Sequence, residues 1–150
     1  MPRLPKLLSL LLAACCVGTP LSAAPPADEI RVLIVTGMDH PAHHWRETTP
    51  ALKQELAKDL RFKIEVLENP YELESADLQR HHVVFLHFNN WQRPDPGGKA
   101  QANLKNFVAD GGGLFVLHFA CGAFGDWTEF PKLAGLVWDR KNTHDPRGPF

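Results

Sequence analysis

Residues 30–36 read IRVLIVT, a nearly continuous run of aliphatic and β-branched side chains that is followed by Gly37. A strand without alternation between apolar and polar residues is buried on both of its faces. Strands of this kind are typical of parallel sheets, in which helices pack on either side. This stretch therefore predicts an α/β fold.

Three further segments predict strands of the same sheet. They are rich in β-branched and aromatic residues and lie at 62–66, 82–88 and 114–119. The segments between them are long enough to hold crossover helices, as parallel pairing requires. We expect a doubly wound parallel sheet with helices on both faces. In such sheets ligands bind outside the carboxyl ends of the strands.

Helices are expected between these strands. Thr49 followed by Pro50 is typical of a helix start, because threonine caps the first turn and proline is tolerated at its first position. The inner face of this helix is expected to carry leucines at helical spacing, Leu52, Leu56 and Leu60. Further helices are expected at 75–80, 99–109 and 127–137.

Length and charge limit the class of protein. The chain has 150 residues, of which 44% are hydrophobic, and its formal net charge is −1. These values predict one globular domain and give no support to a nucleic-acid partner. No G-x-G-x-x-G motif occurs, and the glycines at 111–113 precede a strand instead of opening a helix. A dinucleotide site is therefore not supported. The sequence predicts no particular oligomeric state.

The first residues have the order of a secretory signal peptide. Arg3 and Lys6 precede an apolar stretch at 7–17, and small residues follow at 21–23. This order predicts a signal peptide at 1–23 and a secreted or periplasmic protein. An alternative is a lipoprotein anchored at Cys15, since Leu12-Ala13-Ala14-Cys15 resembles a lipobox. Only that alternative would bring the chain to a membrane.

Polar and aromatic residues follow three of the predicted strands. Amides and carboxylates can bond sugar hydroxyls, and aromatic rings can pack on sugar faces. We therefore predict that a carbohydrate, a small molecule, is the partner of this edge. The predicted wall of its site comprises Asp39, His40, Asn90, Trp91 and Trp127.

Histidines in the same loops raise the question of a metal. No H-E-x-x-H motif is present, so the pattern of a zinc protease is absent. Histidine is nevertheless the commonest metal ligand, and a divalent cation is a possible cofactor. The candidate ligands are His40, His118 and His144.

Cys121 has two interpretations. A strand followed by Ala120-Cys121-Gly122 has the outline of a nucleophile elbow, which would make Cys121 catalytic. A nucleophile also needs a base, and only His144-Asp145 follows it in the chain. The other interpretation is a small buried residue at a tight turn.

Four stretches together resemble one known family. They are VTGMDHPAHHWRETTPAL (35–52), FNNWQRPDPG (88–97), GGGLFVLHFACGAFGDWTEFPKLAGLVWD (111–139) and HDPRGPF (144–150). In combination they are similar to the ThuA-like, or trehalose-utilisation, domain family over residues 30–150. The resemblance implies a flavodoxin-like sheet like that of class I glutamine amidotransferases. It also implies further strands after Phe150, so that 30–150 would be the N-terminal part of the domain.

The resemblance implies a function as well. Family members are associated with sugar metabolism, including keto derivatives of trehalose. By this resemblance, the family's histidine after the fourth strand falls on His118, its following tryptophan on Trp127, its glycine on Gly135 and its later histidine on His144. We expect a domain that acts on or binds a carbohydrate, with His118 and His144 as acid/base or metal-ligand groups. The alternatives are a non-catalytic sugar-binding module, or an amidotransferase-like or hydrolase-like enzyme that depends on Cys121.

Overall fold

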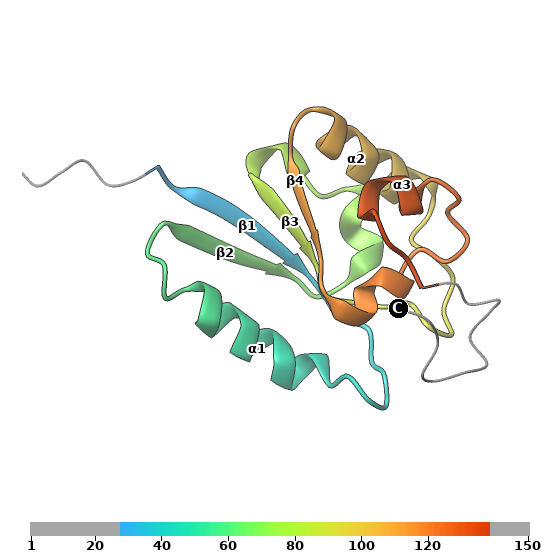
Figure 1. Ribbon diagram of the computed structural model, residues 1–150, viewed down its shortest axis with the longest axis horizontal. Coiled ribbons are helices and arrows are strands. Elements are labelled where there is room, and N and C mark those ends of the chain that lie inside the picture. The colour runs from blue at the N-terminus through green and yellow to red at the C-terminus, as the bar shows by residue number, and fades with distance from the viewer. Residues whose placement is uncertain (1–27, 139–150) are drawn as a thin grey trace, which may run out of the picture.

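The computed structural model describes residues 28–138, which form a parallel four-stranded sheet (Figure 1). The strand order is β2-β1-β3-β4, and every neighbouring pair is parallel. This order is that of flavodoxin-like folds. The predicted α/β fold with a parallel sheet is confirmed. The strands are β1 (Ile30–Val35), β2 (Phe62–Leu67), β3 (Val83–Leu86) and β4 (Gly113–Val116).

Helices cover both faces of the sheet. Figure 1 shows α1 on one side of it, and α2 and α3 on the other. The α-helices are α1 (Trp45–Leu56), α2 (Gly98–Ala109) and α3 (Phe130–Ala134). Three short 3₁₀ segments complete the described part, η1 (Pro70–Glu74), η2 (Leu78–Arg80) and η3 (His118–Gly122). Within residues 28–138, none of the helices has the length and apolar character needed to traverse a bilayer.

Two apolar cores lie on opposite faces of β1, because successive side chains of a strand point to opposite sides. Leu33 and Val35 belong to the larger core, which also contains residues of α2 and α3. Val32 and Ile34 belong to the smaller core, against which α1 packs. All four side chains are buried, and each such burial contributes roughly 1.5–3 kcal/mol. Burial on both faces explains the uninterrupted apolar run of β1.

The first helix begins earlier than Thr49-Pro50 predicts. α1 starts at Trp45, and Pro50 lies inside it. The Thr49 hydroxyl does not cap the helix. It is buried against the sheet, 3.0 Å from Thr36 Oγ1 and 3.0 Å from Nδ1 of His87. The Thr49 hydroxyl, which the sequence predicts as a helix cap, therefore forms tertiary hydrogen bonds instead.

Other predicted boundaries also shift. Leu52 and Leu56 pack against the smaller core as expected, but Leu60 is 87% exposed because α1 ends at Leu56. The segment 75–80 forms no α-helix, and the helix expected at 127–137 is limited to α3. β4 stops at Val116, and the predicted end of that strand turns into η3 instead.

Gly37 sets the exit of the chain from β1. Its φ is +108°, and a Cβ atom there would lie 1.7 Å from the carbonyl oxygen of Glu68. Only glycine tolerates both the backbone conformation and the close approach. The loop after β1 thus passes directly against the end of β2.

β4 is an edge strand of the described sheet. Phe115 of β4 stacks on Phe85 of β3, with ring centroids 4.5 Å apart, yet it is 50% exposed. α1 packs against β1 and β2 and leaves this part of the face open.

Candidate functional site

The sheet places three loops at one edge. Strand order reverses between β1 and β3, so their connections leave in opposite directions and open a crevice at the carboxyl ends. The loop at 36–44 follows β1, and the loop at 87–97 follows β3. η3 follows β4, the neighbour of β3. These are the three connections that the sequence predicted to form a site.

The loop after β1 contains a tight turn that brings two histidines together. The backbone N–H of His43 donates to the carbonyl oxygen of His40 at 3.0 Å. Nδ1 of His40 accepts a second bond from the N–H of Ala42 at 3.0 Å. Pro41 suits the second position of such a turn, because its fixed φ is the one required there. The centroids of the two imidazoles lie 5.2 Å apart.

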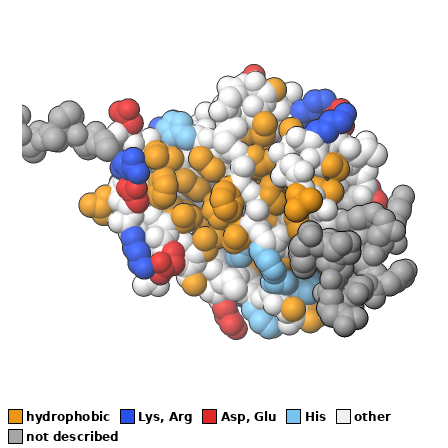
Figure 2. Space-filling view, viewed as in Figure 1, with side chains coloured by type: hydrophobic (Ala, Val, Ile, Leu, Met, Phe, Trp, Pro, Cys, Tyr) orange, Lys and Arg blue, Asp and Glu red, His pale blue; other side chains and the backbone are white. Residues whose placement is uncertain are grey.

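Rings from all three loops meet in a histidine–aromatic cluster, defined as His40, His43, Trp91, His118 and Phe119. The ring of His40 lies 5.1 Å from that of Trp91, edge to face at 89°. The ring of His43 stacks on Phe119 at 3.8 Å and lies 5.2 Å from that of His118. Figure 2 shows histidine side chains gathered side by side on the visible surface. The predicted residues His40, Trp91 and His118 thus come together.

Asn89 connects two of the contributing loops. Its side-chain Nδ2 donates to the carbonyl oxygen of Phe119 at 3.0 Å. Its Oδ1 accepts from the backbone N–H of Trp91 at 2.9 Å. A Cβ atom on Gly122 would come within 2.4 Å of the same amide, so glycine makes room for it. Asn89 therefore fixes Trp91 relative to η3.

His118 sits directly after β4 in an unusual conformation. Its φ is +46°, in the left-handed region that few residues other than glycine adopt. The turn that follows β4 requires this angle, and it leaves the His118 side chain exposed. Left-handed non-glycine residues occur preferentially at functional sites. The elbow-like position after β4 is thus occupied by His118.

Two histidines at this edge favour their neutral forms. Burial lowers the pKa of His43, and the nearby imidazoles of His118 and His40 lower it further. Burial also lowers the pKa of His87, whose ring lies between the hydroxyls of Thr48 and Thr49. A neutral imidazole can accept as well as donate a proton.

Comparison with known proteins decides the family. The sequence profile of the ThuA family, described as trehalose utilisation, matches residues 31–148. The chain belongs to the ThuA family. This membership confirms the resemblance.

One solved structure similar to this ThuA-family chain is a crystal structure of a protein described as ThuA-like, from Parabacteroides merdae ATCC 43184. The two share 25% sequence identity with a TM-score of 0.63, and the match covers 75% of this chain. It covers 40% of the solved chain, so the matched region spans less than half of that protein. A comparison with curated proteins gives no match.

Not every predicted wall residue of the ThuA-family chain lines the cluster. Trp127 is 9% exposed and packs between Phe124 and Phe130 in the larger core. Asn90 is fully buried and bonds Asp95 Oδ1 and the N–H of Phe124, so it orders the loops from within. The structure therefore places Trp127 and Asn90 behind the site.

Asp39 is exposed in the loop after β1, and its carboxylate has a partner. Oδ1 of Asp39 lies 2.5 Å from a guanidinium nitrogen of Arg46. The pair ties the loop after β1 to the first turn of α1. Such an exposed pair contributes about 0–1 kcal/mol, so its main consequence is positional.

Cys121 lacks the features of a nucleophile in the described part of the chain. Burial raises the pKa of its thiol, which opposes formation of the thiolate. Its sulfur is a free thiol, and the hydrogen bonds that affect the pKa of the thiol come from the backbone of Cys121 and Trp138. His144 and Asp145, the predicted base and its partner, lie outside the described residues. The geometry favours the interpretation of a small residue in a turn.

The metal candidates form no complete ligand set in the part that the structure describes. No group of three histidine, cysteine or carboxylate side chains in residues 28–138 is arranged to hold an ion. Nδ1 of His40 already accepts a backbone hydrogen bond. His144 lies outside these residues. The described side chains of His40 and His118 therefore do not by themselves fit a metal centre.

Three residues of the site, His43, Phe119 and Asn89, are not among the predicted site residues. The sequence predicts Phe119 as the end of the fourth strand. The sequence prediction names Asn90, whereas the structure shows that the adjacent Asn89 bonds the loops of the site. An asparagine at the end of a strand indicates a residue that can join two loops, because its side-chain amide both donates and accepts hydrogen bonds. The backbone conformation after β3 decides which of the two adjacent side chains, Asn89 or Asn90, makes these bonds.

Proposed function

We propose that this ThuA-family chain binds a carbohydrate, trehalose or a keto-sugar derivative of it, at the histidine–aromatic cluster. The observation that carries the proposal is the meeting of His40, Trp91 and His118 from three separate loops. Family membership supplies the class of ligand. Ligands of parallel α/β sheets bind at this same edge.

Trp91 supplies the apolar surface of the proposed site. Its side chain is 52% exposed, although tryptophan is usually buried. An exposed indole held by ring contacts and by Asn89 offers a rigid face to the C–H groups of a sugar ring. The imidazole of His40 lies beside the indole, and that of His43 lies next to His40, so both can bond hydroxyls of a ligand.

His118 is the proposed acid/base group. Imidazole exchanges protons near neutral pH, and enolisation beside a ketone needs a base of that kind. His118 would take the proton from the carbon next to the carbonyl and deliver it to the carbonyl oxygen, which gives the enol. Its exposed side chain leaves it accessible to a ligand held on Trp91.

Substitution of His118 tests the proposal. Asparagine tolerates left-handed backbone better than other residues, so His118→Asn preserves the turn. We expect turnover of a 3-keto sugar to fall about 10²–10⁴-fold, while binding measured by calorimetry persists. His44→Gln is the matched control, because His44 is an exposed histidine of the loop after β1 and lies outside the cluster. Equal turnover in His118→Asn and the wild type would refute the role of His118.

A non-catalytic sugar-binding module is the second candidate. It is favoured by the ion pair of Asp39 with Arg46, which occupies the carboxylate nearest the cluster in sequence. An acid/base histidine is usually oriented by such a carboxylate. Sugar binding that is lost in Trp91→Ala, with no turnover in any variant, would support the module.

We also propose export through the segment 1–23. The basic, apolar and small-residue order of that segment supports it. Expression of the whole chain in a bacterial host should give a periplasmic protein that begins at Ala24. Mass spectrometry of the purified chain measures this. A lipid-modified Cys15 would favour the anchored alternative, and an uncleaved cytoplasmic chain would contradict export.

A further inference from the structure

A groove lies between α1 and the end of β2, apart from the histidine–aromatic cluster. Its volume is about 550 Å³, within the range of small-molecule sites. It shares no lining residue with the cluster. The residues that line it are Trp45, Arg46, Thr49, Pro50, Lys53, Val66 and Glu68.

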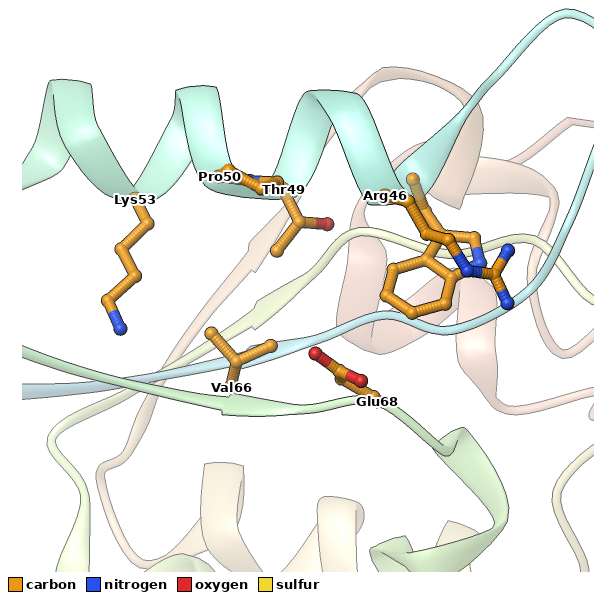
Figure 3. Close-up of a pocket in the computed structure, with 7 residues that line it drawn as sticks. Arg46, Thr49, Pro50, Lys53, Val66 and Glu68 are labelled. Atoms are coloured by element: carbon orange, nitrogen blue, oxygen red, sulfur yellow. The ribbon is translucent and has the colours of Figure 1, made fainter.

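The two walls carry opposite charges. In Figure 3, Lys53 reaches from α1 toward β2, whereas Glu68 and Val66 face α1 from the strand. Lys53 and Glu68 form no ion pair with any residue of the described range 28–138. Two unpaired charges on facing walls can each bond a different group of one ligand.

Arg46 is differently placed. Its guanidinium lies 4.4 Å from the centre of the Trp45 ring and bonds Asp39. Its charge is thus already balanced, so Lys53 is the cation of the groove that remains for a ligand. The buried Nε1 of Trp45 has no hydrogen-bond partner in residues 28–138. A buried polar group without a partner is costly, and a ligand or water would satisfy it.

We propose that this groove binds a small molecule that carries a carboxylate beside several hydroxyl groups, as sugar acids do. Lys53 binds the carboxylate, because an ammonium group forms strong charge-assisted bonds to it. Glu68 accepts bonds from the hydroxyl groups. Pro50 on α1 and Val66 on β2 provide apolar surface for the carbon chain on the two walls. This inference goes beyond the proposed function, since it concerns a second site.

Gluconate and its neutral amide, gluconamide, are the probes that separate charge from shape. Calorimetric titration of the whole chain at low ionic strength should show gluconate binding about tenfold more tightly than gluconamide. Lys53→Gln should abolish this preference. Glu68→Ala should weaken both ligands by about tenfold, because it removes the acceptor of the hydroxyl bonds.

Lys63→Gln is the matched control. Lys63 is exposed on β2, and its position in the strand places it on the face opposite to Val66. It removes the same charge from the chain without touching the groove, so the preference for gluconate should remain. Circular dichroism of each variant establishes that the fold is intact.

Three results would overturn the inference. Neither probe binds, or the preference for gluconate persists in Lys53→Gln, or gluconate binding disappears in Trp91→Ala. The last result would place the ligand at the histidine–aromatic cluster. Unchanged gluconate binding in Trp91→Ala, together with lost sugar binding in that variant, would support two separate sites.

Discussion

The imidazole of His43 stacks on the phenyl ring of Phe119, with centroids 3.8 Å apart and planes inclined by 10°. The two residues are far apart in sequence, and they belong to the loop after β1 and to η3 after β4. The contact exists because parallel strands place their carboxyl ends at the same edge. It partly buries His43 and holds the loop with His40 against the turn with His118.

Removal of the phenyl ring should release His43. In Phe119→Ala the imidazole gains water, so its pKa should rise toward the ordinary value of 6.5, because burial is the largest cause of its lowering. A titration of the histidine ring protons by NMR measures this. Phe115→Ala is the control, since Phe115 is a half-exposed phenylalanine of β4 outside the cluster. An unchanged His43 pKa in Phe119→Ala would show that the stack does not set its environment.

Cys121 should be dispensable for activity. Because burial raises the pKa of the thiol, little thiolate forms at neutral pH, and Cys121→Ser should retain wild-type turnover. Iodoacetamide at pH 7 should modify Cys121 slowly, and peptide mapping by mass spectrometry distinguishes it from Cys15 and Cys16. Rapid labelling with loss of turnover would instead identify a nucleophile.

Alanine substitutions at three glycines should distinguish the cost of a positive φ from the cost of a steric clash with the added Cβ atom. Gly37→Ala combines a φ of +108° with a contact of 1.7 Å, so we expect a chain that does not fold stably. Gly111→Ala has a φ of +95° but open space, so we expect a loss of about 1–2 kcal/mol. Gly98→Ala has open space without a positive φ and should be neutral or slightly stabilising. Urea denaturation gives the three unfolding free energies, and equal values would refute this order.

Mild acid should destabilise the fold through its buried histidines. The pKa of His87 is lowered from 6.5 in the folded chain, so below pH 6.5 the unfolded chain binds a proton that the folded chain does not. Stability is therefore greatest above pH 6.5 and falls by up to about 1.4 kcal/mol per pH unit below it for each such histidine. Urea denaturation between pH 7.5 and 5 measures the slope.

His87→Gln should flatten that dependence. Carboxylates act in a separate range. The bonds to Arg61 lower the pKa of Asp59 to about 2, and the bond to Arg80 lowers the pKa of Glu65. Their contribution is lost only below about pH 4.5. An identical slope between pH 7.5 and 5 in wild type and His87→Gln would contradict the assignment to His87.

The sequence by itself determined the sheet. The run at β1 has no polar face, and only a strand covered on both sides buries such a run. It also predicted an edge for ligand binding, because the loops that contain His40, Trp91 and Cys121 each follow a predicted strand. Local conformational preferences also account for two residues at helix ends. Gly111 follows the end of α2 with a positive φ, and Pro131 lies in the first turn of α3.

Only the tertiary structure decided which side chains share the site. Thr49 and Pro50 have the local chemistry of a helix start, yet Thr49 bonds His87 across the sheet and the helix begins at Trp45. Trp127 and Trp91 look alike in sequence, but one fills the core and the other faces solvent. The physical reason is that local preferences amount to about 1 kcal/mol per residue, whereas burial of a large side chain is worth more. Contacts between distant segments therefore override them.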